Sequence, residues 1–395
     1  YVGHSSDLKF EYHMYVNKAD IDIYKDISLP GNVKSIIASR ISYLLDLKGP
    51  SVVVDTACSS ALVGVHLACK GIINGDCDMA IAGGVKVNLM PIQKGMDDEI
   101  GIRSPGDRAR TFDDSSDGTG SGEGVIAIML KPLSKAIADK DHIYAVIKGS
   151  AVNQDGSSIG LTAPNSAAQE EVILEAWKNA GIDPETISYI EAHGTATKLG
   201  DPIEISGIER AFRKYTDKKN FCAIGSVKTN IGHLDNIAGL AGLVKLILTL
   251  KHREIPASIH FQRPNRKINF IGSPVFVNDR LSKWETDGFP LRGGVSSFGL
   301  AGTNCHIVVE EYKEKENNTE NKMLSGAQVF TLSAQSREVL SDLIVEYKKY
   351  FQQHKEVELK DICYTANSGR MHHSHRLAIV VESVEELIKK LESFH

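Results

Sequence analysis

The chain has 395 residues, of which 42% are hydrophobic and 24% are charged, and its formal net charge is −5 at pH 7. These values are typical of a folded globular enzyme, and the interspersed charges exclude the basic surface of a nucleic-acid-binding protein. No apolar run approaches the roughly 20 residues that cross a bilayer, so no membrane segment is expected.

The first half of the chain alternates apolar runs with a helical pattern. Residues 51–57 are rich in valine and predict a buried strand, and from Ser59 the apolar period becomes helical until Asn74. A second strand at 79–82 is expected to end in a turn at Gly83-Gly84. Further strands are expected at 125–130 and 142–153.

The second half repeats this alternation. Helices are expected at 167–180, 202–215 and 236–250, and strands at 187–193, 221–227 and 305–312. Strands that alternate with helices predict an α/β fold, in which a mixed sheet is covered by helices on both faces.

Three segments are expected along the chain: a large domain at 1–312, a polar linker at 313–326 and a small α/β unit at 327–395. The small unit carries strand patterns at 329–334 and 376–383 and a helical pattern at 336–354. Ser383 and Glu386 form a capping-box pattern that predicts the start of a last helix.

The six cysteines show no paired spacing and no CxxC motif, which predicts reduced thiols in a cytoplasmic protein without a metal site. The histidines His372, His373 and His375 have no cysteine or acidic residue nearby, so we expect them at the surface. The chain begins at Tyr1 inside an apolar stretch, and we expect it to be a piece of a longer polypeptide.

Cys58 lies at the junction of the strand at 51–57 and the following helix, in the segment DTACSSA. A sharp strand-to-helix junction exposes its central side chain, and the helix N-terminus favours a thiolate there. By itself this segment fits a nucleophile and a buried structural cysteine equally well.

Two histidines favour the nucleophile. His193 ends one expected strand in EAHGTATKLGDP, and His233 follows another in SVKTNIGHLD. Each histidine alone is more often a structural residue. Together with a cysteine at an elbow they predict a Cys-His-His site for nucleophilic catalysis.

Four long blocks now identify a resemblance. DTACSSALVGVHLAC, EAHGTATKLGDP, SVKTNIGHLDNIAG and GGVSSFGLAGTNCHIVVEE resemble, in order, the signature blocks of β-ketoacyl synthases, specifically the ketosynthase domains of modular type I polyketide synthases. The resemblance runs from about residue 1 to 312, and it implies a thiolase-like fold of layers α-β-α-β-α. It also implies a homodimer whose interface strand lies near the nucleophile, and a missing N-terminal part, since Cys58 comes early.

The resemblance implies decarboxylative Claisen condensation. Cys58 takes an acyl chain from the phosphopantetheine arm of an upstream acyl carrier protein, with the backbone N–H groups of Cys58 and Leu300 as the oxyanion hole. Phe298 and Leu300 match the gating loop. A malonyl-type extender on a downstream carrier then loses CO₂, and His193 and His233 donate hydrogen bonds to the enolate oxygen as neutral imidazoles. No cofactor binds directly.

The same blocks imply supporting residues. Lys228 sets the local charge and joins a network with Asp201, while Thr195 and Thr197 match the positions that hydrogen-bond the pantetheine amides. The small C-terminal unit resembles the adaptor between ketosynthase and acyltransferase, which implies an adjacent acyltransferase domain.

Two alternatives are weighed. A thiolase would need a second catalytic cysteine, and Cys305, the one candidate, reads as a variant of the ketosynthase TNAH block, so thiolase is rejected. A non-elongating ketosynthase-like domain that only loads and transfers acyl chains stays open as the rival, although it typically lacks the second histidine.

Overall fold

The computed structural model describes residues 1–4, 33–88, 102–313 and 326–394. The chain divides into two compact units, Tyr1–Lys313 and Glu314–His395. Of the linker expected at 313–326, residues 314–325 lie outside the described residues.

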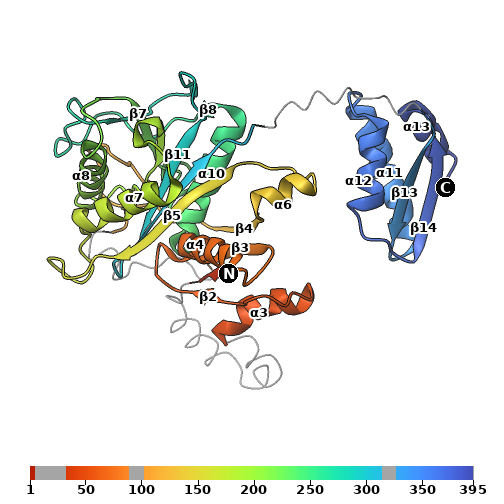
Figure 1. Cartoon of the computed structure of the whole chain (residues 1–395), viewed down its shortest axis with the longest axis horizontal. Helices are drawn as coiled ribbons and strands as arrows, with labels where there is room; N and C mark the ends of the chain where they lie inside the picture. Colours follow the sequence, from red (N-terminus) through yellow and green to blue (C-terminus); the bar gives the residue numbers. More distant parts are fainter. Residues whose placement is uncertain (5–32, 89–101, 314–325, 395) are drawn as a thin grey trace. The chain divides into compact units, whose positions relative to one another are not determined.

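The larger unit contains two mixed sheets (Figure 1). The first has the order β2-β1-β3-β4, with β1 parallel to both β2 and β3, and with β4 antiparallel to β3. Its strands are β1 (Val2–Gly3), β2 (Val53–Val54), β3 (Ala80–Lys86) and β4 (Gly124–Leu130).

The second sheet has the order β5-β12-β11-β6-β7-β9. Strands β5, β12 and β11 pair antiparallel, and β11, β6, β7 and β9 pair parallel. Their bounds are β5 (Val146–Gln154), β6 (Tyr189–Glu191), β7 (Cys222–Gly225), β9 (Val275–Val277), β11 (Arg292–Phe298) and β12 (Thr303–Glu310).

Two apolar helices, α4 (Ser60–Asn74) and α10 (Ala238–His252), lie between the sheets. Helix α4 contacts β1 and β3 on one side and β12 and β5 on the other, and α10 contacts β11 and α4. The window Ala57–Asn74 is long and apolar enough for a membrane span, but half of it is buried inside the protein. We therefore assign α4 as a core helix.

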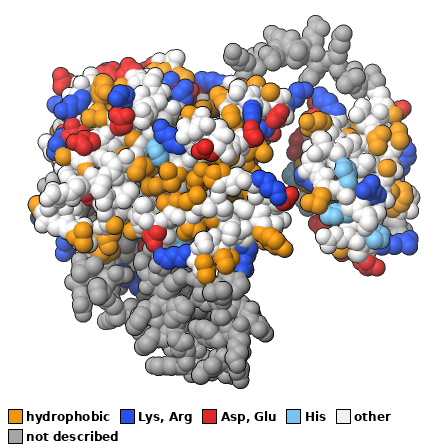
Figure 2. Space-filling view, turned by 60° about the horizontal axis from the view of Figure 1, so that its bottom comes forward, with side chains coloured by type: hydrophobic (Ala, Val, Ile, Leu, Met, Phe, Trp, Pro, Cys, Tyr) orange, Lys and Arg blue, Asp and Glu red, His pale blue; other side chains and the backbone are white. Residues whose placement is uncertain are grey.

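Helices α7 (Ser166–Ala180) and α8 (Gly200–Arg213) cover the other face of the six-stranded sheet (Figure 1). The described residues thus form the layers α-β-α-β, which confirms the predicted α/β class with mixed sheets. On the four-stranded sheet, Val125 and Met129 of β4 are exposed, and Figure 2 shows apolar side chains gathered on one face of the larger unit.

Short elements complete the larger unit: α3 (Lys34–Leu44), α6 (Leu133–Ala138), α9 (Lys228–Ile231), β8 (Glu254–Ile255) and β10 (Ser282–Lys283), with 3-10 turns at Pro184–Thr186 and Asp235–Ile237. The turn expected at Gly83-Gly84 is wrong, because both glycines lie inside β3. A Cβ at Gly83 would come within 2.7 Å of Ile126 O, and one at Gly84 within 2.6 Å of Gly3 O. These glycines therefore allow close strand approach rather than a turn.

The smaller unit pairs β13 (Gln328–Ala334) antiparallel with β14 (His375–Val381). Its helices are α11 (Arg337–Gln353), α12 (Leu359–Ser368) and α13 (Val384–Glu392). The sequence did not predict α12. Ser383 caps α13 by accepting the Glu386 N–H (3.1 Å), and the Glu386 carboxylate returns to the Glu382 N–H (2.8 Å), one residue before the expected partner.

We expect the core between the sheets to dominate stability. Leu62 on α4 is 0% exposed and Leu67 on the same helix is 37% exposed. Leu62→Ala should lower the free energy of unfolding by about 2–5 kcal/mol because it leaves a cavity, and Leu67→Ala should cost clearly less.

Denaturant unfolding followed by tryptophan fluorescence checks this difference. Both tryptophans of the chain, Trp177 and Trp284, belong to the larger unit, so the signal reports that unit alone. Equal losses of stability in the two variants would contradict the assignment of α4 to the layer between the sheets.

Candidate active site

Cys58 lies in a tight turn between β2 and α4. The preceding residue, Ala57, has a φ of 54°, a left-handed conformation that a side chain rarely adopts and that bends the chain sharply before Cys58. The hydroxyl of Ser59 donates to Thr56 O (2.9 Å), that of Ser60 donates to Ala57 O (2.6 Å), and the Thr56 N–H donates to Ser60 Oγ (2.9 Å). The serines of DTACSSA therefore hold the turn.

A second segment, at the end of β11, fixes this turn from the other sheet. The Ser297 hydroxyl donates to Cys58 O (2.9 Å). At the next turn a Cβ on Gly299 would come within 2.3 Å of Thr56 O, so only glycine allows this approach. Of the two predicted gate residues, Phe298 is the buried last residue of β11, and Leu300 is exposed two residues further on.

His193 follows β6, and its backbone is held at both ends. The N–H groups of His193 and Gly194 donate to the two carboxylate oxygens of Glu204 on α8 (2.7 and 2.8 Å). On the other side, Lys228 Nζ donates to His193 O. The backbone at His193 is thus held by a carboxylate on one side and an ammonium on the other.

His233 follows α9 and lies against the glycine-rich segment before β4. Its N–H donates to Gly120 O (2.7 Å), and its carbonyl accepts the Gly122 N–H (3.0 Å). The Asp235 N–H donates to His233 Nδ1 (2.9 Å). A nitrogen that accepts a hydrogen bond carries no proton, so in the neutral imidazole the proton is on Nε2, which is a donor.

The two imidazoles lie together, and the ring of His193 contacts Phe298. Their ring centroids are 5.8 Å apart at an interplanar angle of 84°, and the Phe298 ring is 5.6 Å from that of His193. Burial, with the Lys228 charge second, lowers the pKa of His193 well below its usual range and that of His233 to about 3. Both rings are therefore neutral near pH 7.

Lys228 begins α9 and is 3% exposed. Burial lowers its pKa, and the charges of Glu204, Cys58, Glu191 and Asp201 act in the opposite direction. The ammonium therefore interacts electrostatically with the Cys58 thiol and with both histidines.

Asp201 interacts with Lys228 only through its charge. Its carboxylate accepts the N–H groups of Phe112 (2.7 Å) and Ala196 (2.9 Å), and no hydrogen bond joins it to Lys228. Burial raises the pKa of Asp201 and that of Glu204 to about 7. The carboxylate that holds the His193 backbone opposite Lys228 is Glu204.

Thr195 and Thr197 lie in the half-buried loop after His193. Their hydroxyls are 3.2 Å apart, and Thr197 Oγ1 also accepts the Gly200 N–H (3.1 Å). At least one hydroxyl hydrogen in this pair is available for another acceptor.

Two buried carboxylates of this region escaped the sequence analysis: Glu191, at the end of β6, and Glu204, on α8. Glu191 could have been found from the sequence, because an acidic residue inside an apolar strand is expected to be buried and to need a partner. The sequence does not indicate a buried Glu204, since an acidic residue in an amphipathic helix ordinarily faces solvent.

The bond from Ser297 to Cys58 O and the contact of the Phe298 ring with His193 link the strained turn of the thiol to two neutral imidazoles, and Lys228 adds a buried ammonium. The thiol can carry an acyl group, and the imidazole N–H of His233 can stabilise negative charge on an oxygen. Such a set fits acyl transfer with an enolate intermediate.

Family models match most of the chain: the β-ketoacyl synthase N-terminal domain at residues 1–136, its C-terminal domain at 144–262, and the "CurL-like, PKS C-terminal" family at 328–391. Polyketide synthase PksL of Bacillus subtilis is 44% identical over 365 residues, which are 92% of this chain and 8% of that protein. Polyketide synthase PksM of the same organism is 46% identical over 365 residues, which are 91% of this chain and 8% of that protein.

Solved structures agree with these matches. The ketosynthase from module 6 of the bacillaene synthase of Bacillus subtilis 168 has a TM-score of 0.85 and 42% identity, covering all of this chain and 66% of that one. The oxazolomycin ketosynthase domain from Streptomyces albus has a TM-score of 0.82 and 35% identity, over 91% of this chain and 63% of that one. The fold is thus thiolase-like, and the chain spans about two thirds of these ketosynthases.

Sequence, fold and the thiol with its two imidazoles lead to one assignment: the chain belongs to the β-ketoacyl synthase family of acyltransferases, among the ketosynthases of polyketide synthases.

Proposed function

We propose that this chain catalyses decarboxylative Claisen condensation, in which a Cys58-bound acyl or polyketide chain is joined to a malonyl-type extender on acyl carrier protein. The observation that carries the proposal is the hydrogen bond from the Asp235 N–H to His233 Nδ1 (2.9 Å), since it leaves Nε2–H as a donor. A transfer that only loads and passes on acyl chains has no enolate and needs no such donor.

In the first stage the Cys58 thiolate attacks the thioester carbonyl of the phosphopantetheine-bound chain. The backbone N–H groups of Cys58 and Leu300 stabilise the oxyanion, and the pantetheine thiolate leaves. Phe298 and Leu300 act as the gate, and Thr195 and Thr197 hydrogen-bond the pantetheine amides.

In the second stage the malonyl thioester loses CO₂, and the electron pair of the broken C–C bond forms an enolate. His193 and His233 donate hydrogen bonds to its oxygen while remaining neutral. The enolate carbon attacks the acyl carbonyl, Cys58 leaves as a thiolate, and the carrier keeps the extended β-ketoacyl chain. Lys228 and Asp201 support the charge balance.

The partners follow from this chemistry. Upstream and downstream carrier proteins deliver both substrates on phosphopantetheine, and an acyltransferase domain adjoins the small unit at 327–395. The domain boundaries at 312 and 326 and a cytoplasmic location belong to the same proposal. Homodimerisation is supported by the position of β2 at the edge of its sheet, directly before the Cys58 turn.

Stage-specific variants test the proposal in the whole protein. The native protein should become acylated on Cys58 and then release CO₂ from malonyl-carrier protein with chain extension. His233→Ala should keep acylation but lose about 10²–10³-fold in CO₂ release, because the enolate loses a donor. Mass spectrometry of Cys58 and radiolabelled CO₂ release measure the two stages.

Cys58→Ala is the control, and it should abolish acylation. Acylation of the native protein without CO₂ release or extension would refute the condensation and support the loading and transfer alternative.

The neutral state of His233 has a consequence for stability. Its pKa falls from 6.5 in the unfolded chain to about 3 when folded, so between these values only the unfolded state binds the proton. The contribution of the neutral His233 to the free energy of unfolding is therefore fully present above pH 6.5. It is lost as the pH falls below that value, by up to about 1.4 kcal/mol per pH unit. His233→Gln should therefore reduce the loss of stability between pH 6 and pH 4.

Denaturant unfolding at several pH values measures this slope. Asp201 and Glu204 contribute with the opposite sign, because burial raises their pKa values, but they are present in both proteins. The exposed His252→Gln serves as the matched control. The same slope in His233→Gln and the native protein would show that His233 is not held neutral by the fold.

A further inference from the structure

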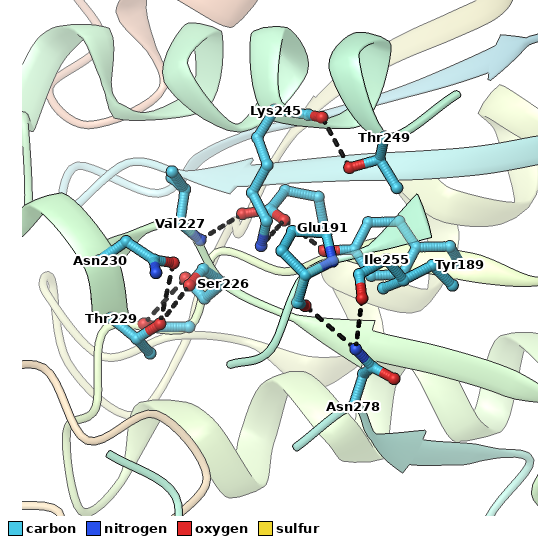
Figure 3. A network of polar contacts seen from close by, with 12 residues as sticks. Tyr189, Glu191, Ser226, Val227, Thr229, Asn230, Lys245, Thr249, Ile255 and Asn278 are labelled. Carbon is cyan, nitrogen blue, oxygen red and sulfur yellow. Dashed lines mark hydrogen bonds and ion pairs between the residues drawn. The ribbon is translucent and has the colours of Figure 1, made fainter. Parts of the chain in front are cut away.

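Glu191, a carboxylate with no role in the proposed chemistry, lies behind the site at the end of β6 and is 1% exposed. Its Oε1 accepts the Val227 N–H, and its Oε2 accepts the Tyr189 hydroxyl hydrogen (2.6 Å) and pairs with Lys245 Nζ on α10 (2.7 Å). Figure 3 shows these three partners converging on the Glu191 carboxylate from the start of α9, from β6 and from α10.

The contacts of Glu191 close a ring through the active site. Glu191 lies two residues before His193 in the chain, and Val227 directly precedes Lys228. Lys228 Nζ donates to His193 O, and the Val227 N–H donates to Glu191 Oε1. Two hydrogen bonds and two short covalent links therefore connect the histidine and the ammonium in one circuit.

The two carboxylate oxygens of Glu191 bind different partners. Oε1 holds the residue before Lys228, while Oε2 is anchored by Tyr189 and Lys245. Burial and then the Glu191 charge raise the pKa of Tyr189 well above its usual range, so its hydroxyl stays protonated and donates.

Helix α10 is shaped for this contact. A Cβ at Gly242 would lie 3.0 Å from Glu191 Cγ, so the glycine lets the helix approach the carboxylate closely. Lys245, one turn along α10, then reaches Oε2 and supplies the positive charge that a buried carboxylate needs.

Glu191 also contributes charge to the site. The groups whose charges raise the pKa of Lys228 against the effect of burial are Glu204, Cys58, Glu191 and Asp201. Glu204 and Asp201 bind backbone N–H groups, whereas Glu191 alone among the three carboxylates accepts the amide directly before Lys228.

We propose that Glu191, anchored by Lys245 and Tyr189, is a positioning residue that places Lys228 and His193 for the decarboxylation and condensation stage. The inference rests on the proposed function, since it assigns Glu191 to one stage of that reaction. It acts through other residues, and it touches no reacting atom.

The test compares two rates in the whole protein carrying Glu191→Gln. The kcat of CO₂ release from malonyl-carrier protein should fall by about 10-fold or more with KM unchanged, because a displaced donor weakens stabilisation of the enolate alone. Acylation of Cys58 should change less than about 3-fold, because the turn that holds Cys58 is fixed by other contacts.

Two further variants separate positioning from stability. Glu191→Gln with Lys245→Met removes the ammonium that the single variant leaves unpaired, and it should regain thermal stability without regaining kcat. Glu311→Gln is the matched control, because Glu311 is also buried, accepts a backbone N–H from Leu291 (2.9 Å) and pairs with Arg253. It should lose stability and keep the native ratio of the two rates.

The outcomes are distinct. A native ratio of the two rates in folded Glu191→Gln, or recovery of kcat together with stability in the double variant, would overturn the positioning role alone. Absence of CO₂ release from the native protein would overturn the proposed function and the role of Glu191 with it.

Discussion

The buried ammonium of Lys228 is the charge around which the site is organised. An ammonium out of water is costly unless it is surrounded by compensating groups, and here the His193 carbonyl binds it while Glu204, Glu191 and Asp201 supply negative charge. Burial lowers the pKa values of both imidazoles, and the charge of the same ammonium adds to this effect. One buried charge therefore helps to keep two imidazoles neutral and to hold the loop that carries one of them.

The site forms where two sheets meet across a layer of helices. Cys58 precedes α4 on the side of the four-stranded sheet, and His193 and α9 follow neighbouring parallel strands, β6 and β7, of the six-stranded sheet. Parallel neighbours end at the same edge of a sheet, so their following loops converge. The bond from Ser297 to the Cys58 carbonyl then joins the thiol to the sheet that carries the histidines.

Several elements could be predicted because their signals are local. Helix α4 ends at Asn74, with Gly75 in a left-handed C-cap, and α13 begins after Ser383, both as expected. Of the strand expected at 51–57, the structure assigns only Val53–Val54 to β2, where it pairs with Val2–Gly3. The turn predicted at Gly83-Gly84 is wrong, since a glycine pair in a turn and a glycine pair that allows close strand packing look alike in sequence.

Sequence by itself determined the family, the α/β class, and the thiol and two histidines as candidates, because these depend on motifs and periodicity within short segments. Only the tertiary structure decided the tautomer of His233, the pairing of Lys228 with the His193 carbonyl, and the buried positions of Glu191 and Glu204. Their partners lie on other strands and helices, and hydrogen bonding and burial depend on distances between segments remote in the chain. The local turn alone makes Cys58 a candidate nucleophile. Its contact with Ser297, in contrast, forms only because the two sheets pack together in the folded chain.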